Sequence, residues 1–198
     1  MSIQLQHRYT LEEYFALERT SEGKYEYWQG EVFAMSGASP AHAQIQVNLI
    51  TLLRSQLRGR PCRIFPSDIR LKVPSLPPYR YPDLSALCGE PVFETLGGLD
   101  VLTNPTLIVE ILSPTTEAFD RGDKFTHYKS ISSFSEYLLM AQHRPHVGQY
   151  VKQSAEVWSY QEYNDLSASL YVHALECRLV LEELYQDVIF VPPASFGV

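Results

Sequence analysis

Apolar residues recur at helical spacing in one long segment in the first third of the chain. The residues that share this helical face are Ile45, Leu49, Leu52, Leu53 and Leu57. Ser39 precedes the segment as a favoured helix cap, and Pro40 is tolerated in the first helical turn. The pattern predicts a strong helix from residue 39 to about residue 59.

Two shorter helices and a hairpin follow from local signals. Thr10 with Glu13 three residues later forms a capping-box pattern, which predicts a short helix over residues 10–17. Residues 24–35 alternate in polarity around a central Gln-Gly, which predicts two short strands joined by a turn. Residues 113–129 begin with a Ser-Pro break and predict a helix that crosses back over the sheet.

Several segments have the polarity pattern of strands. Residues 62–73 predict a strand in which Ile69, Leu71 and Val73 share an apolar face and Asp68, Arg70 and Lys72 a charged one. Residues 106–112 are apolar except for Glu110, as in a central strand that is covered on both sides. The other predicted strands are 81–88, 136–141, 147–152, 156–160, 167–172 and 179–185, of which the last is also compatible with a helix. Residues 89–104 predict a loop with room for one short strand or helical turn. The alternation of helices and strands over 198 residues predicts a single α/β domain.

Composition and charge exclude some classes of protein. The chain is 45% hydrophobic and 20% charged, which is typical of a packed globule. Its formal net charge of -7 argues against a protein that coats nucleic acid through bulk electrostatics, but it leaves room for a local basic groove. No signal pattern or membrane-spanning apolar run is evident, and the three cysteines lack metal-type spacing. We therefore expect a cytoplasmic protein whose reduced cysteines are small apolar filler.

Two acidic residues on separate predicted strands are the main candidates for chemistry. Asp83 and Glu110 would meet if those strands were neighbours, and two carboxylates can hold Mg²⁺ or Mn²⁺ for phosphodiester hydrolysis. A Pro-Asp pair is by itself more often a turn or strand entry. Glu110 is the stronger candidate, because a charged acid in an apolar strand is costly unless it binds a metal or a partner such as an arginine, or reaches solvent. A backbone carbonyl near Ile111 or Leu112 is a further expected ligand.

A cation near the scissile phosphate would complete such a site. The usual acid-x-lysine arrangement places a lysine two residues after the acid, but this position is Leu112. Lys124, on the following helix, can take that place. Asp120 lies one helical turn before Lys124 and is either an orienting carboxylate or a member of an ordinary ion pair.

Other residues have a structural and a functional interpretation. Asp68 is either a further ligand or part of a solvated charged face, and His42, with Gln46 one turn later, either adjoins the site or serves as a cap or interface residue. Glu26 and Glu31 flank the hairpin turn and are more often surface charges than metal ligands. Tyr128 is in line with Asp120 and Lys124, but an aromatic residue at that spacing is usually part of the core. Four further aromatic residues either stack on bases or pack at an edge strand or dimer contact: Tyr79, Tyr81, Tyr160 and Tyr163.

Three motifs carry a resemblance to a known family. Residues 81–83 (YPD), 104–116 (NPTLIVEILSPTT) and 120–128 (DRGDKFTHY) are similar to the Uma-type restriction endonucleases, long described as a domain of unknown function within the PD-(D/E)XK nuclease superfamily. The similarity extends over nearly the whole chain. It implies a restriction-endonuclease-like fold, a divalent metal, DNA as the substrate and a homodimer. By position, Asp83 is the motif aspartate, Glu110 the motif glutamate and Lys124 the displaced lysine.

The resemblance also gives the expected organisation of the chain. A central mixed sheet flanked by helices would form the nuclease core at residues 39–145. An amino-terminal helix and hairpin at 1–38, a strand-rich carboxy-terminal extension at 146–190 and a tail at 191–198 would surround it. The leading hypothesis is a metal-dependent endonuclease. The alternatives are a catalytically silent nucleic-acid-binding or assembly module of the same fold, and a hydrolase of small phosphodiesters.

Overall fold

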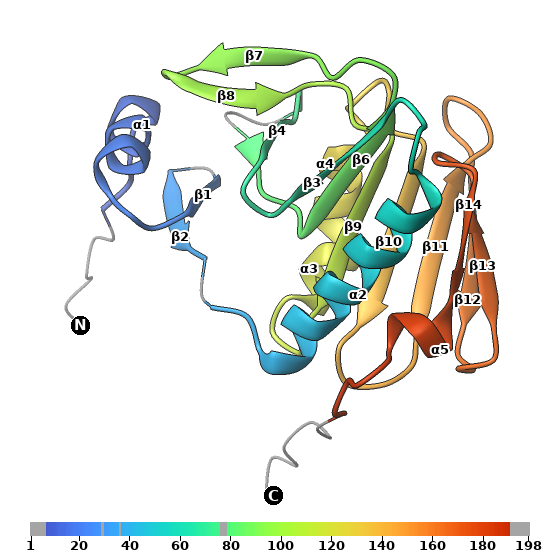
Figure 1. Ribbon diagram of the computed structural model, residues 1–198. Coiled ribbons are helices and arrows are strands. Elements are labelled where there is room, and N and C mark those ends of the chain that lie inside the picture. The colour runs from blue at the N-terminus through green and yellow to red at the C-terminus, as the bar shows by residue number, and fades with distance from the viewer. Residues whose placement is uncertain (1–6, 29, 36, 76–78, 191–198) are drawn as a thin grey trace, which may run out of the picture.

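A six-stranded mixed sheet forms the centre of the molecule (Figure 1). The structure is a computed structural model, and it describes residues 7–28, 30–35, 37–75 and 79–190. Across the sheet the strand order is β12-β11-β10-β9-β6-β3. The strands are β3 (Cys62–Pro66), β6 (Leu84–Cys88), β9 (Leu107–Leu112), β10 (Glu136–Ala141), β11 (Val147–Lys152) and β12 (Trp158–Tyr163). β9 and β10 are parallel, and the other pairs are antiparallel, so the predicted central mixed sheet is confirmed.

The long predicted helix, α2 (Pro40–Gln56), covers one face of the sheet (Figure 1). Its cap is Ser39, whose hydroxyl accepts a hydrogen bond from the backbone N–H of His42 at 3.1 Å. Ile45, Leu49 and Leu53 are fully buried against the apolar residues of β6 and β9. Within the described part of the chain, no helix is both long and apolar enough to cross a bilayer.

The opposite face of the sheet is covered by the connection between β9 and β10. It consists of α3 (Glu117–Phe119), a π-helical turn η1 (Asp120–Lys124) and α4 (Phe125–Tyr128), which confirms the predicted crossing helix. Aromatic and aliphatic side chains of α4, β9 and β10 form the core on this face. π-helical turns occur frequently at functional sites, and this one carries both Asp120 and Lys124.

Smaller elements surround the central sheet. The amino-terminal part has α1 (Leu11–Thr20), with the predicted Thr10–Glu13 capping box, and the predicted hairpin. The hairpin strands are β1 (Tyr25–Trp28) and β2 (Glu31–Ala34). A second sheet contains β4 (Arg70–Lys72), β5 (Tyr79–Arg80), β7 (Phe93–Leu96) and β8 (Leu99–Leu102). The carboxy-terminal part adds β13 (Ser169–Val172), β14 (Cys177–Val180) and α5 (Leu181–Leu184), and the predicted tail at 191–198 lies outside the described residues.

Two predicted segments differ from the structure. The single strand predicted over 62–73 is wrong, because the chain turns after Pro66 and the N–H of Ile69 donates to the Pro66 carbonyl at 3.2 Å. β3 therefore belongs to the central sheet and β4 to the second sheet. The loop predicted over 89–104 is a hairpin of β7 and β8. Its turn uses Gly97 and Gly98 at φ of 59° and 82°, a conformation that glycine adopts without steric cost.

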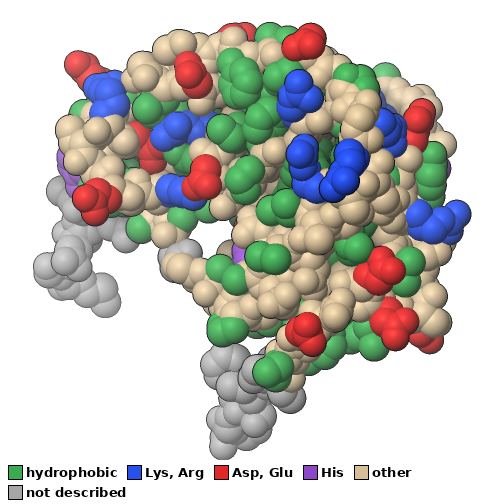
Figure 2. Space-filling model, viewed as in Figure 1, with side chains coloured by type: hydrophobic (Ala, Val, Ile, Leu, Met, Phe, Trp, Pro, Cys, Tyr) green, Lys and Arg blue, Asp and Glu red, His purple; other side chains and the backbone are tan. Residues whose placement is uncertain are grey.

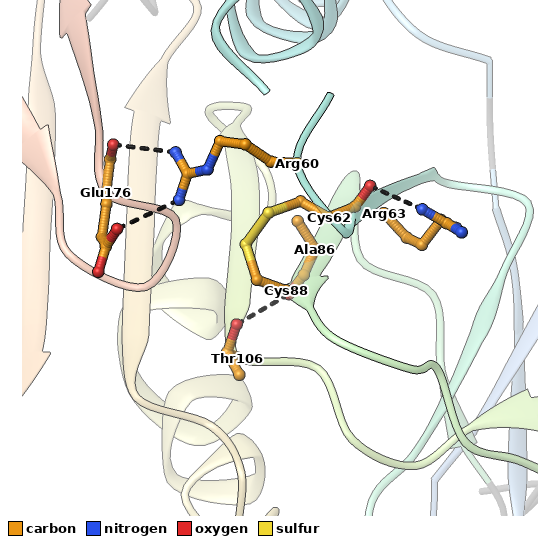
Figure 3. The surroundings of a disulfide bond; sticks show 7 residues. All are labelled: Arg60, Cys62, Arg63, Ala86, Cys88, Thr106 and Glu176. Atoms are coloured by element: carbon orange, nitrogen blue, oxygen red, sulfur yellow. Dashed lines mark hydrogen bonds and ion pairs between the residues drawn. A yellow bond between two sulfur atoms is a disulfide. The ribbon is translucent and has the colours of Figure 1, made fainter. Parts of the chain in front are cut away.

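Two of the three cysteines form a disulfide, so the prediction of reduced cysteines is wrong (Figure 3). Cys62 and Cys88 are direct register partners on the antiparallel strands β3 and β6, with their Cα atoms 3.9 Å apart. This proximity arises only when the two strands pair. Cys177 is free and buried, and burial raises the pKa of its thiol to about 11, as expected of apolar filler.

Removing the disulfide is expected to destabilise the fold. The cysteines are separated by 26 residues, and the loss of loop-closure entropy predicts a decrease of about 3.5 kcal/mol in the free energy of unfolding of Cys62→Ala/Cys88→Ala. Urea denaturation of the oxidised protein and the double variant measures this difference. A reductant should destabilise only the wild-type protein, and equal unfolding free energies without reductant would contradict the prediction.

Candidate functional site

Asp83 and Glu110 lie opposite one another at the end of the β6–β9 ladder. The antiparallel register pairs Ala86 with Leu107, and Leu84 with Val109. Continuing this register by one residue places Asp83 across from Glu110 on the same face of the sheet. Oδ2 of Asp83 also accepts a hydrogen bond from the backbone N–H of Ile111 at 2.6 Å. The two candidate acids are therefore brought together as predicted.

Glu110 points to the face of the sheet that α4 covers. Its neighbours at alternate positions on β9, Ile108 and Leu112, belong to the apolar core on that face, whereas Val109 and Ile111 face α2. Glu110 is 3% exposed. A carboxylate in these surroundings requires charged or hydrogen-bonding partners.

Lys124 is one of these partners. Its Nζ lies 2.9 Å from Oε1 of Glu110 and 3.4 Å from Oδ1 of Asp120, and its side chain is 8% exposed. The lysine therefore reaches the acid from the π-helical turn that follows β9 and α3. Leu112, where the usual lysine would stand, is fully buried in the core beneath this turn.

Two tyrosines of the core are also parts of the site. The hydroxyl of Tyr128 donates to Oε1 of Glu110 at 2.8 Å, and that of Tyr137 donates to the backbone carbonyl of Asp120 at 3.0 Å. The sequence places Tyr128 in line with Asp120 and Lys124 and favours a core role. In the structure Tyr128 is both a core residue and a hydrogen-bond partner of Glu110.

Residues of α2 contact Asp83 from the other face of the sheet. Nε2 of His42 lies 3.1 Å from Oδ1 of Asp83, and the side-chain amide of Gln46 donates to the Asp83 backbone carbonyl at 2.8 Å. The sequence had left open whether His42 adjoins the acids or serves elsewhere. The Asp83 carboxylate is therefore contacted both by α2, through His42, and by β9, through the N–H of Ile111.

The pKa of Glu110 is raised well above its ordinary value. Burial is the main cause, and the charge of Lys124 opposes it. The negative charges of Asp120 and Asp83 raise this pKa further. Burial also raises the pKa of Asp120, again against the effect of Lys124. The negative charges of Asp83, Glu110 and Asp120 are thus mutually unfavourable, and a bound cation would reduce their repulsion.

The pKa of Lys124 is also raised well above its ordinary value. Burial by itself lowers it, but the charge of Glu110, followed by those of Glu26 and Asp120, outweighs the effect of burial. Lys124 is thus held as a cation beside the two acids.

Other candidate residues lie apart from this group. Asp68 stands in the turn between β3 and β4 and forms an ion pair with Lys24. Glu31 is exposed on β2, and among the described residues no hydrogen bond or ion pair joins it to the acids. Tyr79 and Tyr81 are buried and donate their hydroxyls to Glu18, at 3.1 and 2.7 Å, so their rings are packed within the protein.

The donor set is suited to a hard divalent cation. Mg²⁺ is commonly bound by one or two carboxylates and keeps several water ligands. The carbonyl of Leu112 accepts a hydrogen bond from the N–H of Gln142 at 3.3 Å. In the described residues, no three His, Cys, Asp or Glu side chains are grouped as a ready metal site. Asp83 and Glu110 are the two carboxylates of this group that could hold such an ion.

Comparisons with known proteins agree with this architecture. The fold is restriction-endonuclease-like: a solved structure titled as a "putative nuclease belonging to DUF820" from Anabaena variabilis ATCC 29413 matches with a TM-score of 0.69 and 20% identity, over 89% of this chain and 97% of that one. The family model described as "Uma2: Putative restriction endonuclease" matches residues 11–182. The chain belongs to this Uma2 family, as its motifs had indicated.

Two relatives from Synechocystis sp. (strain ATCC 27184 / PCC 6803 / Kazusa) are similar over most of their length. "Uncharacterized protein slr1290" is 32% identical over 179 residues, which cover 90% of this chain and 92% of the relative. "Uncharacterized protein sll1609" is 37% identical over 149 residues, which cover 75% of this chain and 84% of the relative. The similarity therefore includes the central sheet and extends well beyond the three motifs.

Proposed function

We propose that this protein is a DNA endonuclease that requires Mg²⁺ or Mn²⁺. Asp83 and Glu110 would hold the ion, which would polarise the scissile phosphate and lower the pKa of a bound water. Lys124 would place its ammonium beside the phosphate and stabilise the charge that develops there. The observation that supports this most strongly is the 2.9 Å approach of Lys124 Nζ to Glu110, across the strand ladder from Asp83.

The neighbouring residues would hold these groups in place. Tyr128 donates to Oε1 of Glu110, the oxygen that also faces Lys124, and no described residue donates to Oε2. Oε2 is therefore the oxygen best placed to bind a metal. Asp120 lies beside Lys124 and keeps its side chain from rotating away. His42 would have the same effect on Asp83.

A cleavage assay tests the proposal. Purified protein should convert plasmid DNA to nicked or linear forms with Mg²⁺ or Mn²⁺, and Asp83→Asn should remove this activity because it removes a charged ligand. Asp100→Asn is a matched control, because Asp100 is exposed on β8 and contacts Thr95. Failure of the wild-type protein to bind Mn²⁺ at millimolar concentration would favour the catalytically silent module.

A local group of arginines supports DNA as the substrate despite the net charge of -7. No Asp or Glu occurs between Glu31 and Asp68, whereas four arginines lie near the end of α2 and the start of β3: Arg54, Arg58, Arg60 and Arg63. Figure 2 shows Lys and Arg side chains gathered over this part of the visible face. Figure 3 places Arg60 and Arg63 on either side of the disulfide and shows Arg60 paired with Glu176, at 3.4 Å. Such a group can contact the phosphate backbone while the acids act elsewhere.

Neutralising two of these arginines is expected to weaken the dependence of DNA affinity on salt. Each phosphate contact contributes roughly 0.9 to the slope of log affinity against log salt, so Arg54→Gln/Arg58→Gln should reduce that slope by about two. Fluorescence anisotropy with labelled duplex DNA in Ca²⁺ or EDTA measures it. The control variant Arg19→Gln/Lys72→Gln removes the same amount of positive charge outside the arginine group. In the wild-type protein, Arg19 donates to the Gly97 carbonyl and Lys72 pairs with Glu94. Equal loss of slope in both variants would contradict a role for this arginine group.

A further inference from the structure

Glu26, on β1 of the amino-terminal hairpin, contacts the segment that leads to Asp83. Its Oε1 accepts a hydrogen bond from the backbone N–H of Tyr81 at 3.2 Å, and its Oε2 lies 3.2 Å from Nη1 of Arg80. The side chains of Glu26 and Arg80 are 13% and 2% exposed. One carboxylate therefore holds two consecutive residues through both of its oxygens.

These contacts constrain the position of Asp83. Tyr81 is two residues before Asp83, and the residue between them is Pro82, whose ring fixes its own φ angle. Few torsions are left between the amide that Glu26 holds and the aspartate. A shift of the Tyr81 amide would therefore move Asp83 relative to Glu110.

A second carboxylate fixes the same segment to the amino-terminal part. Glu18 of α1 is 7% exposed and accepts hydrogen bonds from the hydroxyls of Tyr79 and Tyr81. It also accepts one from the backbone N–H of Tyr25 at 2.7 Å, which ties α1 to β1 beside Glu26. The hairpin is thus anchored to the segment before Asp83, and Glu26 is held in a defined place.

The charge of Glu26 also acts on the candidate site itself. Burial lowers the pKa of Lys124, but the charges of Glu110 and then Glu26 raise it. Burial is the main cause of the raised pKa of Tyr128, and the charges of Glu110 and Glu26 raise it further. Lys124 and Tyr128 both contact Glu110. Glu26 therefore lies close enough to influence the group electrostatically as well as through the backbone.

We propose that Glu26 is a positioning residue that sets the metal affinity of the site by holding Arg80 and Tyr81, and thereby Asp83. The amino-terminal hairpin thus completes a site whose acids lie on the central sheet. This inference rests on the metal site of the proposed function. In the sequence, Glu26 and Glu31 had the same interpretation, as acids that flank the hairpin turn. The contacts with Arg80 and Tyr81 distinguish Glu26 from Glu31.

Calorimetric titration with Mn²⁺ tests the role of Glu26. Substitutions of residues that orient metal ligands commonly weaken affinity 10- to 100-fold, so about this loss is expected for Glu26→Ala. Glu26→Gln should lose less, because its amide oxygen can still accept from the Tyr81 N–H. Glu22→Gln, an exposed glutamate just before β1, is the matched control and should bind as the wild type does.

A double-mutant cycle with Asp83→Asn separates positioning from general destabilisation. If Glu26 acts through Asp83, the effect of Glu26→Ala on Mn²⁺ affinity should largely disappear in the Asp83→Asn background. Equal fold losses in both backgrounds would overturn the inference, as would wild-type affinity in folded Glu26→Ala. If the alanine variant does not fold, the glutamine variant decides between these outcomes. Absence of Mn²⁺ binding by the wild-type protein would instead refute the proposed function.

Discussion

Glu110→Gln is expected to remove most of the Mn²⁺ affinity and to reduce DNA cleavage roughly a thousandfold. Glutamine has nearly the shape of glutamate and can still accept a hydrogen bond from Tyr128, but it lacks the charge that a divalent cation requires. The loss of several kcal/mol of transition-state stabilisation that the cation supplies corresponds to about this factor in rate. Calorimetry and a plasmid cleavage assay on the same preparations measure both effects.

The pH dependence of metal affinity provides a second measure of Glu110. Because burial raises its pKa well above the ordinary value, the protonated form persists to higher pH than in a free glutamate. A metal binds the deprotonated form, so wild-type Mn²⁺ affinity should rise with pH through this raised pKa and level off above it. Any residual affinity of Glu110→Gln should lack this rise.

Glu136→Gln is the matched control for Glu110→Gln. Glu136 is also a fully buried glutamate on a central strand, but it contacts Gln149 and the backbone N–H of Ala174. Its substitution is expected to lower stability without changing Mn²⁺ affinity in the folded protein. Cleavage by Glu110→Gln at the wild-type rate, or metal binding lost equally in both variants, would exclude the assigned role of Glu110.

Lys124→Met is expected to separate metal binding from catalysis. Removing a positioned group that stabilises charge in the transition state typically costs a factor of about 100 to 1,000 in kcat. Mn²⁺ affinity should be unchanged or higher, because the ammonium that competes with the ion for Glu110 is gone. Steady-state cleavage kinetics and calorimetry give the two values. Lys129→Met, which removes an ammonium lying over the Phe125 ring, is the matched control.

A weakening of Mn²⁺ binding in Lys124→Met that equals its loss of cleavage would contradict this assignment, because it would indicate a structural role. Moving the lysine by Leu112→Lys/Lys124→Leu should not restore activity. Position 112 is fully buried among apolar side chains, where an ammonium is costly to place. We therefore expect a lysine to reach Glu110 from position 124, on the π-helical turn, and not from position 112.

Much of the local structure follows from short-range patterns. The capped α2 helix, the amino-terminal hairpin, the buried strand β9 and the crossing helix with Lys124 were all predicted. Helix caps, periodicity and turns depend on residues a few positions apart, which a single sequence displays directly. The same patterns isolated Glu110 as an acid in an apolar strand and Leu112 as the missing lysine position.

The prediction of strands was wrong where one continuous segment of the chain contributes strands to two sheets. Residues 68–73 alternate in polarity and were joined to residues 62–66 as one strand, yet Pro66 ends β3 and the chain turns into another sheet. The disulfide was missed for a related reason, because Cys62 and Cys88 meet only through the β3–β6 register. The strand register leaves no local signal, whereas the change of sheet is marked by the turn residues Pro66, Ser67 and Asp68, which the prediction of one strand passed over.

The sequence by itself determined the kinds of elements, the acids to consider and the family, because these depend on local periodicity and on motifs. Only the tertiary structure decided that Asp83 stands opposite Glu110, that Lys124 reaches the glutamate from a π-helical turn, and that Tyr128 belongs to the site. It also showed that Glu26 contacts Arg80 and Tyr81, in the segment before Asp83, whereas Glu31 has no such contact among the described residues. Contacts between residues far apart in the chain follow from packing and strand register, which local patterns do not encode.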